Sequence, residues 1–101
     1  MYINIIESYR RVVAICDKEI LGKKFEEGEK QLYVKESFYK GERGKLVNEE
    51  ELIELINENR LEDATFNIVG DKSIQAAIKT GLINKNFTRK VDKIPFALVL
   101  I

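Results

Sequence analysis

Residues 48–81, NEEELIELINENRLEDATFNIVGDKSIQAAIKTG, predict a helix, a strand and a second helix in close succession. Asn48 and Glu51 have the spacing of a capping box, in which each side chain bonds the backbone amide of the other residue. The apolar residues that follow are spaced for one face of a helix: Leu52, Ile53, Leu55 and Ile56. The sequence therefore predicts an amphipathic helix that begins at Asn48.

The second half of this stretch predicts a strand and another helix. Residues 65–70, TFNIVG, are mostly apolar and end at a glycine, as expected for a buried strand followed by a tight turn. Asp71 is a preferred N-cap residue for the helix that follows, and Gly81 ends it. The predicted buried stripe of this helix consists of Ile74, Ala77 and Ile78.

Short apolar runs on either side supply the remaining strands of a sheet. They lie at residues 2–7, 11–16, 31–35, 87–91 and 96–101. Residues 8–10 have the length of a hairpin loop, residues 23–30 are polar and predict a loop, and Pro95 separates the last two strands. We expect one α+β domain over residues 1–101, with two main helices packed on one face of a mixed, mostly antiparallel sheet.

Composition excludes several classes of protein. The chain has 101 residues, one cysteine and no histidine, so it cannot form an internal disulfide, a Cys/His zinc site or a Ser-His-Asp triad. Glu26, Glu27 and Glu29 lack the spacing of a calcium loop, and we predict no metal site and no cofactor. No apolar run approaches the roughly 18 residues of a membrane span, which predicts a cytoplasmic protein. Abundant lysine and glutamate are typical of a thermophile, and the base composition of a genome is the alternative source of the same bias.

Cys16 and Asp17 form the first candidate site, at a strand end that opens a short helical turn. A thiol near a helix N-terminus has a lowered pKa and can act as a nucleophile. In the alternative interpretation, Cys16 is a small buried apolar residue and Asp17 is an N-cap. The adjacent carboxylate raises the pKa of the thiol, which favours the alternative.

Asn67 and Gly70 form the second candidate site, where the predicted strand turns into the second helix. Backbone amides at such a helix N-terminus can bind an anion, although Asp71 would repel a phosphate. The alternative is a structural glycine turn before a capped helix. Asn67 needs a separate explanation, because a buried amide without hydrogen-bond partners costs a few kcal/mol.

Basic residues form the third candidate site. Residues 17–64 carry 14 acids and 9 bases, a net −5, whereas residues 65–101 carry 2 acids and 6 bases, a net +4. The predicted RNA-binding residues are Lys85, Arg89, Lys90 and Lys93, with Phe87 between them. Two interpretations apply equally to a further set of aromatic residues, which either offer stacking surface for RNA bases or belong to the rim of the core: Tyr9, Tyr33, Phe38 and Tyr39. The alternative is a solvated strand edge, where lysine opposes aggregation.

Several segments together resemble DUF424, a family of small archaeal proteins without an established activity. They are residues 16–23 (CDKEILGK), 25–28 (FEEG), 34–42 and 67–81. The resemblance implies a stand-alone archaeal cytoplasmic protein of about this length. Many members of the family have a Pro-His-Ala sequence where this chain has Pro95-Phe96-Ala97. A histidine-dependent activity is therefore not expected here.

These observations lead to three hypotheses. The first is a non-enzymatic protein that binds RNA or the ribosome and is linked to translation. The second is a small-molecule-binding protein or enzyme with its site near Cys16, Asp17, Asn67 and Gly70. The third is self-association through the apolar C-terminal strand, residues 96–101.

Overall fold

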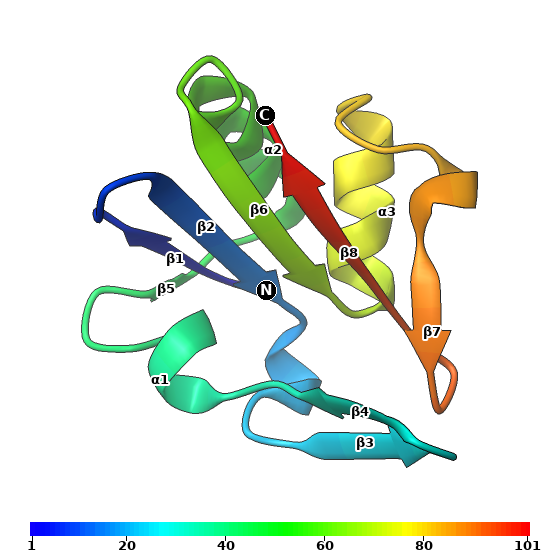
Figure 1. Ribbon diagram of the computed structural model, residues 1–101. Helices are drawn as coiled ribbons and strands as arrows, with labels where there is room; N and C mark the ends of the chain where they lie inside the picture. Colours follow the sequence, from blue (N-terminus) through cyan, green and yellow to red (C-terminus); the bar gives the residue numbers. More distant parts are fainter.

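A six-stranded sheet forms the centre of the molecule, and the computed structural model describes all residues from 1 to 101 (Figure 1). The strands are β1 (Tyr2–Ile6), β2 (Arg11–Cys16), β3 (Lys24–Glu27), β4 (Lys30–Tyr33), β5 (Lys45–Leu46), β6 (Ala64–Val69), β7 (Arg89–Val91) and β8 (Ile94–Leu100). The helices are α1 (Glu36–Tyr39), α2 (Glu49–Asn59) and α3 (Asp71–Lys79), with 3₁₀ turns η1 (Lys18–Ile20) and η2 (Lys85–Phe87).

The strand order of the main sheet is β5-β1-β2-β6-β8-β7, and β3 and β4 form a separate hairpin. β2 and β6 run parallel, and all other neighbours are antiparallel. The chain between β2 and β6 must cross from one end of the sheet to the other, and it contains the hairpin, α1, β5 and α2. The predicted α+β class and the mixed, mostly antiparallel sheet are both confirmed.

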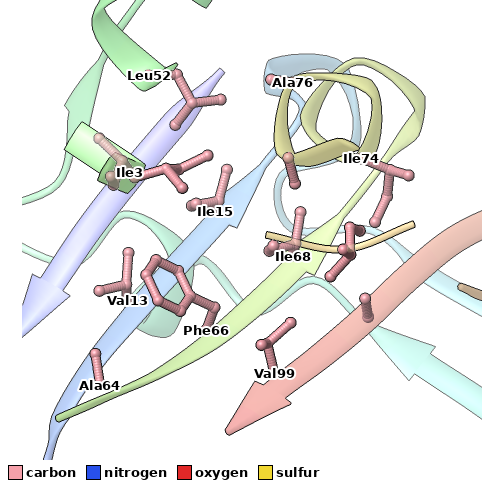
Figure 2. Close-up of a cluster of buried hydrophobic side chains, with 14 of the residues drawn as sticks. Ile3, Val13, Ile15, Leu52, Ala64, Phe66, Ile68, Ile74, Ala76 and Val99 are labelled. Carbon is pink, nitrogen blue, oxygen red and sulfur yellow. The ribbon is translucent and has the colours of Figure 1, made fainter. Parts of the chain in front are cut away.

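The two main helices, α2 and α3, pack on one face of the sheet, as predicted. Figure 2 shows Ile15, Phe66 and Ile68 of the sheet below Ile74 and Ala76 of α3. The buried residues of α2 in the same core are Leu52 and Ile56. Removing each side chain of this size from water contributes about 1.5–3 kcal/mol, so this layer is the main source of stability.

The predicted capping box at the start of α2 is confirmed. The backbone N–H of Glu51 donates to Oδ1 of Asn48 at 2.8 Å, and the N–H of Asn48 donates to Oε1 of Glu51 at 3.5 Å. The local sequence was sufficient for this prediction because both partners lie within one turn of the helix.

The opposite face of the sheet is only partly covered. α1 and the β3–β4 hairpin lie together at the end toward which β2 and β6 point (Figure 1). They bury a second, smaller cluster: Ala14, Cys16, Val34, Tyr39 and Val69. Beyond this cluster no element covers the sheet, and Leu98 and Leu100 of β8 are 52% and 70% exposed. We call this uncovered surface of Thr65, Asn67, Leu98 and Leu100 the open face.

The prediction of a loop at residues 23–30 is wrong, because this segment forms β3 and the turn into β4. β3 does not alternate clearly, since three of its four residues are exposed. The hairpin signal lies in the two-residue loop instead, where Gly28 adopts a φ of +63°.

The C-terminal strands also differ from the prediction. η2 replaces the start of the predicted strand 87–91, and Pro95 lies inside β8 rather than between the strands. Asp92 and Lys93 make the turn instead, with φ values of 48° and 68°. The carbonyl of Pro95 accepts the N–H of Gly70 at 2.8 Å. Neither Asp92 nor Lys93 is glycine, which is why the turn was missed.

Candidate functional site

Asp17 connects the end of β2 to the N-terminus of α3. Its Oδ1 accepts the backbone N–H of Ser73 at 2.8 Å and the Ser73 hydroxyl at 2.7 Å. Its Oδ2 accepts the N–H of Lys72 at 3.0 Å. The carboxylate thus satisfies amides that are free at any helix N-terminus and adds a favourable charge to the helix dipole.

This contact corrects two predictions about caps. Asp17 makes no side-chain cap to its own turn η1, although it is the residue that precedes it. α3 is preceded by Gly70, and Asp71 is its first residue rather than its cap. The capping side chain therefore comes from a residue more than fifty positions earlier in the sequence.

Gly70 allows the Asp17 carboxylate to approach. Its φ is +110°, a conformation that residues with a side chain rarely adopt. A Cβ at this position would lie 2.6 Å from Oδ1 and 2.7 Å from Oδ2 of Asp17. The glycine of the predicted turn is thus required both by backbone conformation and by the space that Asp17 occupies.

Cys16 is fully buried beside this anchor. Burial, with a smaller contribution from the Asp17 charge, raises the pKa of the thiol from 9.0 to about 12. A nucleophilic cysteine needs access and a lowered pKa. Cys16 has neither property, so the structure gives it the role of a small apolar core residue.

The two candidate sites at Cys16-Asp17 and at Gly70 do meet, since β2 and β6 are adjacent and parallel. After β2 the chain passes to the face that carries the hairpin, and after β6 it enters α3 on the other face. In open α/β sheets, ligands bind in the crevice at such a point. Here the carboxylate of Asp17 occupies the place of an anionic ligand, and the arrangement serves as a structural anchor.

Asn67 lies away from this anchor, on the open face. Its register partners are Ala14 in β2 and Leu98 in β8. The side chain is partly exposed and forms no hydrogen bond within the protein. The side chain avoids the cost of a buried amide without partners because it is partly exposed on the open face.

A groove of about 530 Å³ adjoins the open face. Its lining residues come from η2, β7 and β8: Asn86, Phe87, Thr88, Arg89, Phe96, Ala97 and Leu98. Phe87 is 50% exposed. Arg89 of β7 is the register partner of Phe96 of β8, so the side chains of Arg89 and Phe96 project on the same side of the sheet. Phe96 stands where the resemblance implies a histidine. No acidic side chain lines the groove.

The predicted basic residues do not form one patch. Lys85, Arg89, Lys90 and Lys93 are all exposed, and none of them forms an ion pair. Arg89 lines the groove, and Lys85 precedes a lining residue in η2. Lys90 projects to the opposite side of β7 because side chains alternate along a strand, and Lys93 lies in the turn.

The other aromatic residues do not join this groove. Tyr39 is buried and packs edge-to-face on Phe38 with ring centres 5.0 Å apart. Tyr33 stacks under the Lys24 ammonium at 4.8 Å, and Tyr9 is fully exposed in the β1–β2 loop. Sequence reasoning missed Phe96 and Leu98 as groove residues. Residues 96–101 are all apolar, so the sequence carries no alternation that marks which side chains of β8 are exposed.

Acidic residues do not gather into a metal site either. No group of three or more potential ligand side chains comes together. Glu27 accepts the backbone N–H of Asp92 at 2.8 Å and thereby ties the hairpin to the β7–β8 turn. None of the helices is long and apolar enough to cross a membrane.

Fold and site together define a small α+β domain with a helix anchored by a distant carboxylate and with an open sheet face beside a groove that contains Arg89. The chain belongs to the DUF424 family, described as a protein of unknown function, whose model matches residues 6–101. The predicted family is thus confirmed.

A solved structure has the same fold. It is the crystal structure of an uncharacterized conserved protein from Methanopyrus kandleri, with a TM-score of 0.84 and 23% sequence identity. The match covers 98% of this chain and 89% of the other. No curated protein matches the sequence.

Proposed function

We propose that this protein is a non-enzymatic RNA-binding protein that holds single-stranded RNA in the groove and across the open face. The observation that carries the proposal is the joint placement of Phe87, Phe96 and Arg89 around one groove without an acidic side chain. Aromatic rings stack on bases, and an arginine beside them binds the backbone phosphate.

Charge supports the same ligand. The C-terminal third carries a net +4, from 2 acids and 6 bases in residues 65–101, although the whole chain is neutral. Lys85 and Arg89 are free to meet phosphates because neither is paired with a carboxylate. Binding of this kind is not sequence-specific and weakens with salt. The ribosome and its RNAs are the source of ligand that we expect, as predicted from the sequence.

The experiment adds the protein to a fluorescent single-stranded RNA, at low and at physiological salt, and monitors binding by fluorescence anisotropy. We expect Phe87→Ala to weaken binding about tenfold, since a stacked base contributes roughly 1–3 kcal/mol. Arg89→Ala should weaken binding, and the slope of log affinity against log salt concentration should decrease by about 1, as expected for the loss of one phosphate contact. Lys45→Ala, an exposed lysine in the edge strand β5 at the other side of the sheet, is the matched control and should bind as the wild type does.

Absence of binding at low salt, or equal binding by Arg89→Ala and Lys45→Ala, would remove the basis of the proposal. Self-association is the competing use of this surface. β7 pairs only with residues 94–96 of β8, so a second copy could use both the exposed side chains of β8 and the unpaired backbone edge of residues 97–100. A dimer that Leu98→Lys dissociates, with no RNA binding, would assign the open face to a second copy.

A further inference from the structure

Asn67 lies in the middle of the sheet with an amide that the fold does not use. It belongs to β6, which has β2 on one side and β8 on the other. Its neighbours Phe66 and Ile68 point into the core under the helices, so Asn67 points to the open face. Asparagine is disfavoured in strands, and a central position gives it no local reason to be there.

Most other asparagines have a structural role in this chain. Side-chain hydrogen bonds within the protein engage Asn4, Asn48, Asn57, Asn59 and Asn84. The side chains of Asn67 and Asn86 form no such bond. Asn86 lines the groove, and Asn67 is the direct register partner of Leu98, which also lines it. The two unused amides are therefore both placed at the same surface.

The register fixes how near Asn67 is to the groove. Side chains directly opposite each other in an antiparallel pair have Cβ atoms about 4.5–5.5 Å apart. Leu98 and Phe96 share one side of β8, and Arg89 faces Phe96 from β7. A base that packs on Phe96 and Leu98, with its phosphate at Arg89, would thus present its edge toward β6.

We propose that Asn67 reads the edge of this base and gives the protein a preference for adenine. The inference rests on the proposed RNA-binding function. A carboxamide carries a donor and an acceptor side by side, and adenine offers the matching acceptor N7 and donor N6. Single-stranded RNA exposes this edge, whereas in an RNA double helix it lies in a deep, narrow major groove that side chains cannot read. Thr65, two residues along the same side of β6, adds a hydroxyl at the end of the open face.

The test compares oligo(A), oligo(C) and oligo(U) of equal length by anisotropy. We expect the wild type to prefer oligo(A) about tenfold, in the range of one good bidentate contact. Asn67→Leu, which keeps the size of the side chain, should reduce oligo(A) binding to the level of the other two. Arg89→Ala should weaken all three equally. Gln75→Ala, an exposed amide on α3 at the far side of the sheet, is the matched control and should change nothing.

A measurement on the unmodified protein accompanies the variants. The side-chain NH₂ signals of Asn67 in ¹⁵N-labelled protein should shift when oligo(A) is added, more than with oligo(U). RNA binding that depends on Arg89 but shows no base preference, or keeps its preference in Asn67→Leu, would overturn this inference and leave the proposed function standing. Absence of binding to all three oligonucleotides would overturn both.

Discussion

At the scale of single residues, Cys16 and Tyr39 should make the folded state less stable as the pH becomes alkaline. Burial raises the pKa of Cys16 from 9.0 to about 12 and that of Tyr39 from 10.0 to about 12. Both groups keep their protons in the folded state at pH values where the unfolded chain loses them. Their contribution is therefore complete below about pH 9 and is lost as the pH rises toward 12.

We expect the urea midpoint to fall between pH 9 and pH 11, and to fall less in Cys16→Ala and in Tyr39→Phe. Tyr9→Phe is the control, because Tyr9 is fully exposed. An equally steep fall in Cys16→Ala and in the wild type would show that the Cys16 thiol is not responsible.

The sequence predicted only part of this behaviour. The effect of Asp17 on the thiol follows from adjacency, and it is indeed one of the causes that raise the pKa. The larger cause is burial under Val34 and Tyr39, which come from the hairpin and from α1. No local pattern around Cys16 specifies that these segments return to cover it.

At the scale of elements, α3 depends on a carboxylate from outside its own sequence. Asp17→Ala leaves the buried amide and hydroxyl of Ser73 without their acceptor, and also the partly buried amide of Lys72. We expect a loss of about 1–3 kcal/mol in the free energy of unfolding, measured by urea denaturation. Asp71→Ala, in the first turn of α3, is the control and should cost well under 1 kcal/mol.

A double-mutant cycle with Gly70 checks the mechanism. Gly70→Ala destabilises through its positive φ and through its clash with the Asp17 carboxylate. In the Asp17→Ala background only the φ cost remains, so the two losses should sum to more than that of the double variant. Strictly additive losses would contradict the close approach of Gly70 and Asp17.

The sequence predicts a helix cap correctly only when both partners of the cap lie close together in the chain. The capping box of α2 was predicted correctly because Asn48 and Glu51 are three residues apart. Asp17 and Asp71 were also recognised as caps, but each was assigned to the helix nearest in sequence. The true assignment depends on the parallel pairing of β2 with β6, which places Asp17 beside Gly70.

At the scale of the whole molecule, the class of fold was predictable but the strand order was not. The apolar runs located most strands of the main sheet because each is long enough to show a buried pattern. The pairing of β2 with β6 joins segments about fifty residues apart, which no local pattern encodes. The open face was equally hidden, since it is defined by what α1 and the hairpin leave uncovered.

The centre of the main sheet and the β3–β4 hairpin should differ in local stability. β2 and β6 lie between paired strands and under two helices, whereas β3 and β4 pair only with each other. Isolated two-stranded hairpins are marginal in water. At the base of the hairpin, the N–H of Gly22 donates to the carbonyl of Val34 and the N–H of Val34 donates to the carbonyl of Lys23. Near the tip, the N–H of Asp92 donates to Glu27.

We expect native-state hydrogen exchange to show this difference directly. Amides of β3 and β4 should exchange through local opening, and those of β2 and β6 only through global unfolding. Glu27→Ala removes the contact near the hairpin tip, so it should speed exchange in β3 and β4 and leave β2 and β6 unchanged. Glu26→Ala, an exposed neighbour that forms no side-chain hydrogen bond or ion pair, is the control. Hairpin amides as protected as those of β6 would mean that the hairpin unfolds only with the rest of the molecule, so that the cover over Cys16 is as stable as the core under the helices.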